Sequence, residues 1–203
     1  MTNIYILFYL LLIRSSHSLP SLPSNAIKIQ SHIIHVKQQQ PLTFIIENSS
    51  EIFEKVPGLT TQFYHTQPLL YKIRFDGVCT TYSGVWTRAF VRLMVDDSLL
   101  YGFQLTPNTV DRWKSISGAT SLTDVDQIGG GSSLTIPTSE LTCSKTDFIY
   151  LQPGLHTLDV GARGDGTATP SMSVRGGQLT IELIQADQQA EPMNVSMANP
   201  LGR

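Results

Sequence analysis

"LLYKIRFDGVC", residues 69–79, carries the clearest structural signal in the chain. Its residues alternate in polarity, with Tyr71, Ile73 and Phe75 on one side and Lys72, Arg74 and Asp76 on the other. Successive side chains of a β-strand point to opposite faces of the sheet. The stretch therefore predicts a strand with one face in the core and the other toward solvent.

The same period of two recurs on both sides of this stretch. In VWTRAFVRLMV, residues 85–95, one face carries Ala89, Val91, Leu93 and Val95, and the opposite face carries Arg88 and Arg92. In QLTIELIQ, residues 178–185, Leu179, Ile181 and Leu183 are expected to face inward. Shorter strand-like runs are 27–33, 42–47, 148–151 and 156–160. Turns are expected at Asp96-Asp97-Ser98 and Gln152-Pro153-Gly154, and a loop over 120–133.

Short alternating strands separated by turns, with no long amphipathic helix, predict an all-β fold. We expect a single antiparallel β-sandwich or jelly-roll domain over residues 27–186, because each strand has one apolar face that can pack against a second sheet. The chain of 203 residues is long enough for one domain with tails. Charged residues make up 15% and the net charge is −2, so a nucleic-acid partner is not expected.

The two ends differ in composition from the expected domain. Residues 4–13 (IYILFYLLLI) are apolar without a break, and small polar residues follow. Ten helical residues rise only about 15 Å, half of a bilayer core. We therefore expect a cleaved signal peptide at 1–18 and no membrane span afterwards, with an uncleaved anchor or a buried strand as the alternatives. A flexible leader is expected at 19–26 and a disordered tail at 187–203.

Other features of the sequence also fit a secreted, extracellular glycoprotein. Its two cysteines, Cys79 and Cys143, are expected to form a disulfide worth about 4 kcal/mol in an oxidising compartment. Two free buried thiols are the alternative. Asn48 and Asn194 each begin an N-glycosylation triplet.

Three segments carry a resemblance to known domains: YKIRFDGVC (71–79), AFVRLMVDD (89–97) and LQPGLHTLDVGAR (151–163). Together they resemble secreted β-sandwich domains, which include carbohydrate-binding jelly rolls and the heads of complement-type and tumour-necrosis-factor-type proteins. The resemblance covers residues 69–185 and lies in core and turn positions. It implies the fold and secretion, and it implies no catalytic or ligand-binding residue.

The tripeptide Arg163-Gly164-Asp165 is the first candidate binding site. Glycines at 161, 164 and 166 predict a mobile, exposed connection between two strands. An exposed turn of this sequence can present a carboxylate and a guanidinium to an integrin. The alternative is an ordinary hairpin loop, because Arg, Gly and Asp all suit turns.

Two aspartates are the candidate metal ligands. Asp124 and Asp126 resemble the start of a calcium loop, but Ile128 and Thr135 occupy the fifth and twelfth positions, where that loop needs oxygen ligands. A looser calcium site at the two aspartates and a solvated acidic loop both remain open. His156 is expected to be a hydrogen-bonded structural residue. No cofactor is expected.

Trp86 and Phe90 form the last candidate site, on the outward face of the strand at 85–95. An exposed aromatic strip there would stack on sugar rings or form a protein interface. The alternative is that a second sheet, a loop or a neighbouring subunit covers both residues. The leading functional hypothesis is a non-enzymatic binding or cell-adhesion module that contacts an extracellular protein and self-associates. The alternatives are a carbohydrate-binding module with a glycan partner and a jelly-roll hydrolase or lyase.

Overall fold

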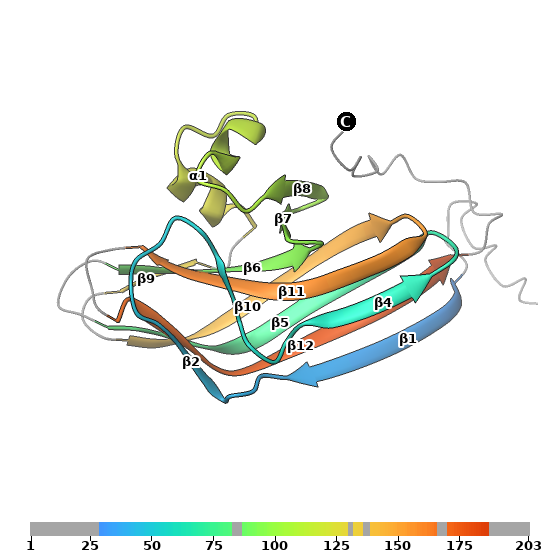
Figure 1. Ribbon diagram of the computed structural model, residues 1–203, viewed down its shortest axis with the longest axis horizontal. Coiled ribbons are helices and arrows are strands. Elements are labelled where there is room, and N and C mark those ends of the chain that lie inside the picture. The colour runs from blue at the N-terminus through green and yellow to red at the C-terminus, as the bar shows by residue number, and fades with distance from the viewer. Residues whose placement is uncertain (1–28, 83–86, 130–131, 136–138, 166–169, 187–203) are drawn as a thin grey trace, which may run out of the picture.

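Figure 1 shows the computed structural model of the protein, in which two antiparallel sheets pack face to face as a β-sandwich. The structure describes residues 29–82, 87–129, 132–135, 139–165 and 170–186. The expected signal peptide, leader and tail lie outside these residues. The sandwich confirms the all-β fold class predicted from the period-two segments.

The first sheet, sheet A, consists of β1 (Ile29–Gln38), β12 (Met172–Ala186), β5 (Leu69–Thr81) and β10 (Ser139–Leu151) in that order, with β2 (Thr43–Ile46) also paired to β12. The second sheet, sheet B, consists of β3 (Glu54–Lys55), β4 (Thr61–His65), β11 (Gly154–Asp165), β6 (Thr87–Val95), β9 (Ser132–Thr135), β7 (Ser98–Tyr101) and β8 (Gln104–Pro107). In sheet B, β11 pairs with β3, β4 and β6, and β6 also pairs with β7 and β9. This strand order is that of a jelly roll.

The main core fills the space between the two sheets. Strand β5 contributes Tyr71, Ile73 and Phe75, each at most 1% exposed. The inward-facing residues predicted for β6 and β12 are in the same cluster: Ala89, Val91, Leu93, Val95, Leu179, Ile181 and Leu183. The face assignments made from the alternating sequence are therefore confirmed for all three strands.

Cys79 and Cys143 form a disulfide between β5 and β10, which are neighbours in sheet A. Their Cα atoms are 5.7 Å apart. The bond confirms the predicted pairing, and it links two strands of one sheet.

The predicted turn at Asp96-Asp97 is confirmed between β6 and β7. Both aspartates have positive φ, 49° and 64°, as a tight two-residue hairpin with right-handed strand twist requires. A second short connection, Gln152-Pro153, joins β10 to β11 as predicted.

Two predicted elements need correction. The predicted loop at 120–133 contains the helix α1 (Leu122–Gln127), whose N-terminus is capped by the Ser121 hydroxyl accepting from the Asp124 N–H at 3.2 Å. The strand predicted at 148–151 begins much earlier, at Ser139. The first part of this strand was missed because Lys145 and Asp147 occupy inward positions, where an alternating pattern would have hydrophobic residues.

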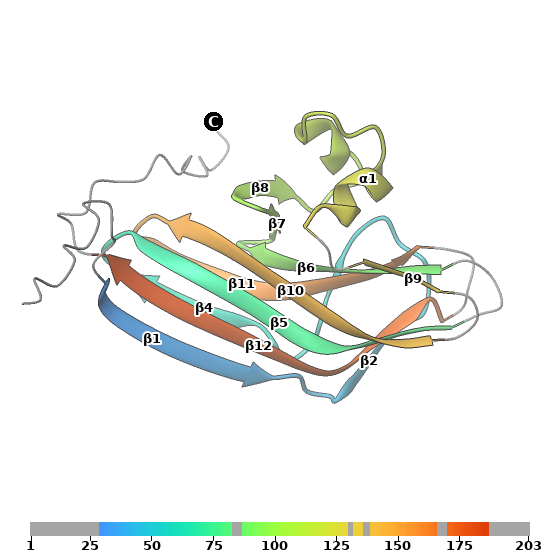
Figure 2. The same cartoon turned by 180° about the vertical axis from the view of Figure 1, so that it is seen from behind.

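An insertion between β6 and β9 covers the outer face of sheet B. It consists of β7, β8, the 3-10 helix η1 (Arg112–Ser115) and α1, and it rises above sheet B in Figures 1 and 2. A second buried cluster lies beneath it: Phe53, Phe90, Met94, Leu99, Tyr101 and Val125. The outer face of sheet A carries no such layer among the described residues, as both figures show.

Candidate functional site

Arg163, Gly164 and Asp165 are the last three residues of β11. The prediction of a mobile exposed loop is wrong for Arg163, which is 3% exposed, and for Gly164, which is also buried. The reason is that β11 continues to pair with β6 to the end of the tripeptide, where Asp165 lies opposite Arg88. The Asp165 carboxylate is partly exposed, 4.0 Å from the Arg88 guanidinium. Of the two charged groups of the tripeptide, only the carboxylate reaches the surface.

Gly164 has a structural role of its own. A Cβ atom at this position would lie 2.7 Å from Cβ of Ser171 and would also collide with the Ser171 hydroxyl. Ser171 is fully buried and donates to the Ile46 carbonyl at 3.0 Å. Glycine is therefore needed here for the close approach of two segments.

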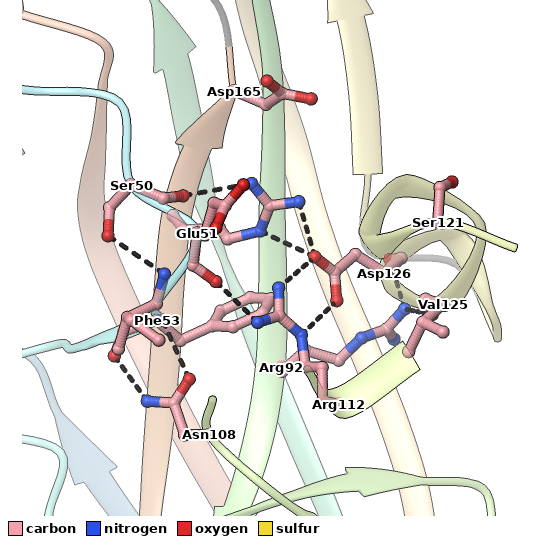
Figure 3. A network of polar contacts seen from close by, with 12 residues as sticks. Ser50, Glu51, Phe53, Arg92, Asn108, Arg112, Ser121, Val125, Asp126 and Asp165 are labelled. Carbon is pink, nitrogen blue, oxygen red and sulfur yellow. Dashed lines mark hydrogen bonds and ion pairs between the residues drawn. The ribbon is translucent and has the colours of Figure 1, made fainter. Parts of the chain in front are cut away.

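Arg163 belongs to a buried network centred on the Asp126 carboxylate, which is shown in Figure 3. Arg163 Nε donates to Asp126 Oδ2 at 2.6 Å, and Arg112 donates to both carboxylate oxygens at 3.0 and 2.5 Å. Tyr101 donates its hydroxyl proton to Oδ1 at 2.7 Å. The carboxylate thus joins three elements, namely β11, η1 and β7, to the helix α1.

A third guanidinium, that of Arg92, binds the backbone of the same helix. It donates to the carbonyls of Val125 and Asp126. The remaining donors of the other two arginines reach the loop before β3, where Arg112 binds the Glu51 carbonyl at 2.5 Å and Arg163 binds the Ser50 carbonyl at 3.1 Å. These bonds hold the insertion and this loop on sheet B, as Figure 3 shows for Ser50, Glu51, Arg92 and Arg112.

The protonation equilibria in the network follow from burial and from the Asp126 charge. Burial raises the pKa of Tyr101, and the neighbouring Asp126 carboxylate raises it further. Burial lowers the pKa of Arg92. Burial also acts to lower the pKa of Arg112, but the hydrogen bond and the charge of Asp126 outweigh it, and the net shift is upward. The tyrosine therefore stays a neutral donor to the carboxylate.

Phe90 packs inside this network. It is fully buried, and the Arg163 guanidinium lies 4.3 Å from the centre of its ring. The expectation of an exposed aromatic strip is wrong for Phe90, because the insertion covers it. The alternative, that these aromatic residues are covered, is confirmed for Phe90. Trp86 lies outside the described residues.

The two aspartates considered as calcium ligands are used in other ways. The exposed carboxylate of Asp124 accepts from the Thr120 N–H and hydroxyl at 3.1 and 2.7 Å. Asp126 is fully buried and is saturated by arginine and tyrosine donors. The expected acidic loop at these residues is a helix, and its two carboxylates do not share a site. In the part of the chain that the structure describes, no three His, Cys, Asp or Glu side chains are placed to hold a metal ion.

Lys145 and Asp147 form a second buried ion pair, on the inward face of β10. The ammonium lies 3.1 Å from the Asp147 carboxylate and donates to the Gly129 carbonyl at 2.9 Å. Burial lowers the pKa of Lys145 and raises that of Asp147, and each partner's charge opposes the other's shift. The pair ties the edge strand β10 to the chain just after α1.

His156 is the only histidine predicted to have a structural role, and the structure confirms this prediction. Its Nδ1 lies 2.8 Å from the Asp96 carboxylate and its Nε2 lies 2.8 Å from the Gln152 carbonyl. The ring thereby joins the two hairpin turns at this end of the sandwich. The neighbouring Tyr71 hydroxyl has a pKa raised to about 12 by burial and by the charge of Asp96. Both ring nitrogens of His156 are thus engaged by oxygen atoms of the protein itself.

The strand β1 is the most exposed apolar element of sheet A. Ile33, Ile34 and Val36 are 51%, 57% and 58% exposed. Between β1 and β4 the sandwich opens into a groove of about 340 Å³, lined by His35, Val36, Lys37, Thr61, Leu179 and Ile181. We call β1 together with this groove the β1 edge. It was not singled out from the sequence, although the run Ile33-Ile34 interrupts the strict alternation and was the available signal.

The two predicted glycosylation sites differ in what the structure describes. Asn48 is exposed just after β2, and its backbone carbonyl accepts from the Ser171 hydroxyl at 3.3 Å. Its side chain is thus at the surface, where a glycan can be attached. Asn194 lies outside the described residues.

No protein-family model matches the chain, and no curated protein matches it. Within the described ranges, no helix is long and apolar enough to cross a membrane. The functional proposal therefore depends on the surface and the polar contacts of this chain alone.

Proposed function

We propose that the protein is a secreted, non-enzymatic binding or adhesion module that acts through protein–protein contacts at the β1 edge. The observation that carries the proposal is the exposure of Ile33, Ile34 and Val36 by more than half on a single edge strand. An apolar edge strand exposes unpaired backbone groups as well as hydrophobic side chains. Proteins normally protect such edges from pairing with a strand of another chain. Ile34 and Val36 lie on the outer face of this strand and Ile33 on the other face, and apolar side chains gathered along an open edge support an interaction site there.

Three features support export. The apolar run at residues 4–13 is typical of a signal peptide. The Cys79–Cys143 disulfide is stable in an oxidising compartment. Asn48 is exposed and available for glycosylation. These features are independent of one another, and each fits an extracellular location.

The carbohydrate-binding alternative receives less support from the described surface. Its large exposed aromatic residues are Tyr64 on β4, Phe103 between β7 and β8, and Phe148 on β10. These three rings belong to separate elements, whereas stacking on a sugar chain needs neighbouring coplanar rings. For a hydrolase or lyase, the pair His156–Asp96 has the right residue types, but the Gln152 carbonyl occupies the second nitrogen.

Expression in a cultured animal cell line tests the export part of the proposal. We expect the protein in the medium, with an N-terminus near Leu19 and a mobility shift after removal of N-linked glycans. Asn48→Gln is expected to abolish one glycan, and Asn194→Gln serves as the matched comparison. Retention of an unglycosylated chain inside the cell would contradict export.

Paired arrays test the binding part. The secreted protein is applied to an array of purified extracellular proteins and to a glycan array. We expect binding on the protein array that Val36→Lys weakens and that Thr146→Lys, on the opposite edge strand β10, leaves unchanged. Binding on the glycan array alone would favour the carbohydrate-binding alternative instead.

A further inference from the structure

The backbone of β1 is open on one side. Among the described residues, β1 pairs only with β12, and it forms one border of sheet A in both views of the molecule. The Gln39 N–H donates to the Gly177 carbonyl at 2.7 Å, so this residue directs its backbone toward β12. Backbone groups alternate in direction along an antiparallel strand. The N–H and C=O groups of the even-numbered residues His32, Ile34, Val36 and Gln38 therefore point to the free side.

The opposite border of sheet A is protected against pairing. Strand β10 carries the inward-pointing charges Lys145 and Asp147, which are 2% and 7% exposed, and it is linked to β5 by the disulfide. Inward-pointing charges on an edge strand are a common protection against the addition of another strand. The ten residues of β1 (IQSHIIHVKQ) include one lysine and no acidic residue, and apolar side chains occupy its centre. One edge of the sheet is thus closed to partners and the other is suited to them.

A second β1 strand fits this edge in one register. In an antiparallel pair the residues directly opposite each other share a face of the sheet. A two-fold axis at Ile34 therefore places Ile34 opposite its own copy and His32 opposite Val36, so the open backbone groups of all three residues exchange hydrogen bonds. On the other face, Ile33 lies opposite His35 and Ser31 opposite Lys37.

Strand length selects this register over its neighbours. A two-fold axis at Ile34 aligns residues 30–38 of one copy with the same residues of the other, whereas an axis at Val36 aligns only residues 34–38 and an axis at His32 aligns residues 29–35. The register centred on Ile34 also places the most apolar part of the strand in the middle.

We propose that two copies of this chain associate through β1, in antiparallel register about Ile34, to form one continuous sheet across the dimer. This proposal rests on the proposed function, because it names the partner of the β1 edge as a second copy. The two copies are equivalent, as in the two-fold dimers that are the commonest protein oligomers.

Symmetric cross-linking of the full secreted protein tests the register. Paired residues that exchange hydrogen bonds have Cα atoms about 5.5 Å apart, within disulfide range. Ile34→Cys is therefore expected to give a disulfide-linked dimer under mild oxidation. Val36→Cys is the matched control, since two copies of that residue would lie roughly 13 Å apart and should not cross-link. Equal cross-linking of both variants, or of neither, would overturn the proposal.

Sedimentation velocity over a range of concentrations tests association without a new cysteine. We expect the wild-type protein to show a concentration-dependent dimer and Ile34→Lys, which sets two ammonium groups against each other on the axis, to weaken it by at least about tenfold in Kd. Thr146→Lys on β10 should leave the dimer unchanged. An exclusively monomeric wild type would overturn self-pairing. If such a monomer still binds the protein array through β1, the proposed function stands and only the partner is different.

Discussion

The outer faces of the two sheets carry similar residues, but only the outer face of sheet B is covered by another part of the described chain. On sheet B, the outward-facing Phe90, Arg92 and Arg163 lie beneath the insertion and are at most 3% exposed. On sheet A, the outward-facing Lys72 and Glu182 form an ion pair at 2.7 Å that remains partly exposed. Both faces show large and charged side chains at alternate positions. Period-two patterning therefore assigns a residue to a face of the sheet but does not predict whether that face is covered.

Covering a charged face changes the energetics of its ion pairs. A buried carboxylate that loses its charge leaves its arginine partners desolvated and unpaired, which costs several kcal/mol. An exposed pair exchanges its partner for water and contributes little. The covered face should therefore respond strongly to single substitutions, whereas the bare face should respond weakly.

The largest effect is expected from Asp126→Asn. The substitution keeps the side-chain shape but removes the negative charge shared by Arg112 and Arg163. We expect the free energy of unfolding to fall by about 4 kcal/mol, measured by urea denaturation. Asp124→Asn, two residues away on the same short helix and exposed, should cost much less than Asp126→Asn. If Asp126→Asn lowered the free energy of unfolding no more than Asp124→Asn does, covered and exposed charges would not differ in their contribution to stability.

On the bare face, Glu182→Gln is expected to cost less than about 1 kcal/mol. Glu182 accepts from Lys72 at 2.7 Å and lies 3.0 Å from His32 Nε2, and unlike Asp126 it remains near solvent. In high salt, the loss in the free energy of unfolding should be smaller still, because salt screens exposed ion pairs. The same urea denaturation measures it. A cost comparable to that of Asp126→Asn would show that the bare face is also covered in solution.

The smallest effect is expected in the loss of stability at acidic pH. Hydrogen bonds from Arg74 and Lys72 hold the pKa values of Asp76 and Glu182 below their ordinary values of 3.8 and 4.5. Their stabilising contribution is therefore complete above those values and is lost as the pH falls through the lower folded-state pKa. Burial raises the pKa of Asp147 on β10, so that group has the opposite sign, and its protonation favours the folded state.

Carboxyl titration by NMR checks both directions in one experiment. Asp76 and Glu182 should titrate below their ordinary ranges and Asp147 above its own. The double variant Asp76→Asn and Glu182→Gln should lose less stability between pH 6 and pH 3 than the wild type. An identical loss would mean that other carboxylates set the acid response.

Much of the sandwich was predictable because strands of the main core keep a strict period. The segments at 69–79, 85–95 and 178–185 identified the buried faces of β5, β6 and β12 correctly. The turn at Asp96-Asp97 was recognisable from its residue types. Helix α1 was missed because its six residues are fewer than two full helical turns, too short to show a helical period.

The polar network was not predictable for a different reason. Its carboxylate, Asp126, lies 37 positions from Arg163 along the chain, and nothing in the local pattern links the two. Arg163-Gly164-Asp165 has the composition of a turn, but pairing with β6 extends the strand over it. Pairing with β6, rather than the composition of the tripeptide, therefore determines that it forms a strand. The β1 edge was also missed, because exposure on an edge strand depends on which neighbours are present.

The disulfide has a consequence for how a cut chain would behave. It closes residues 79–143 into a covalent ring that includes β6, the whole insertion and β9. A protease that cleaves once inside this ring leaves both products attached, and they migrate as one molecule until a reductant opens the bond. Damage to the insertion would therefore be invisible on a non-reducing gel, and the nicked protein would keep both halves of its sandwich together.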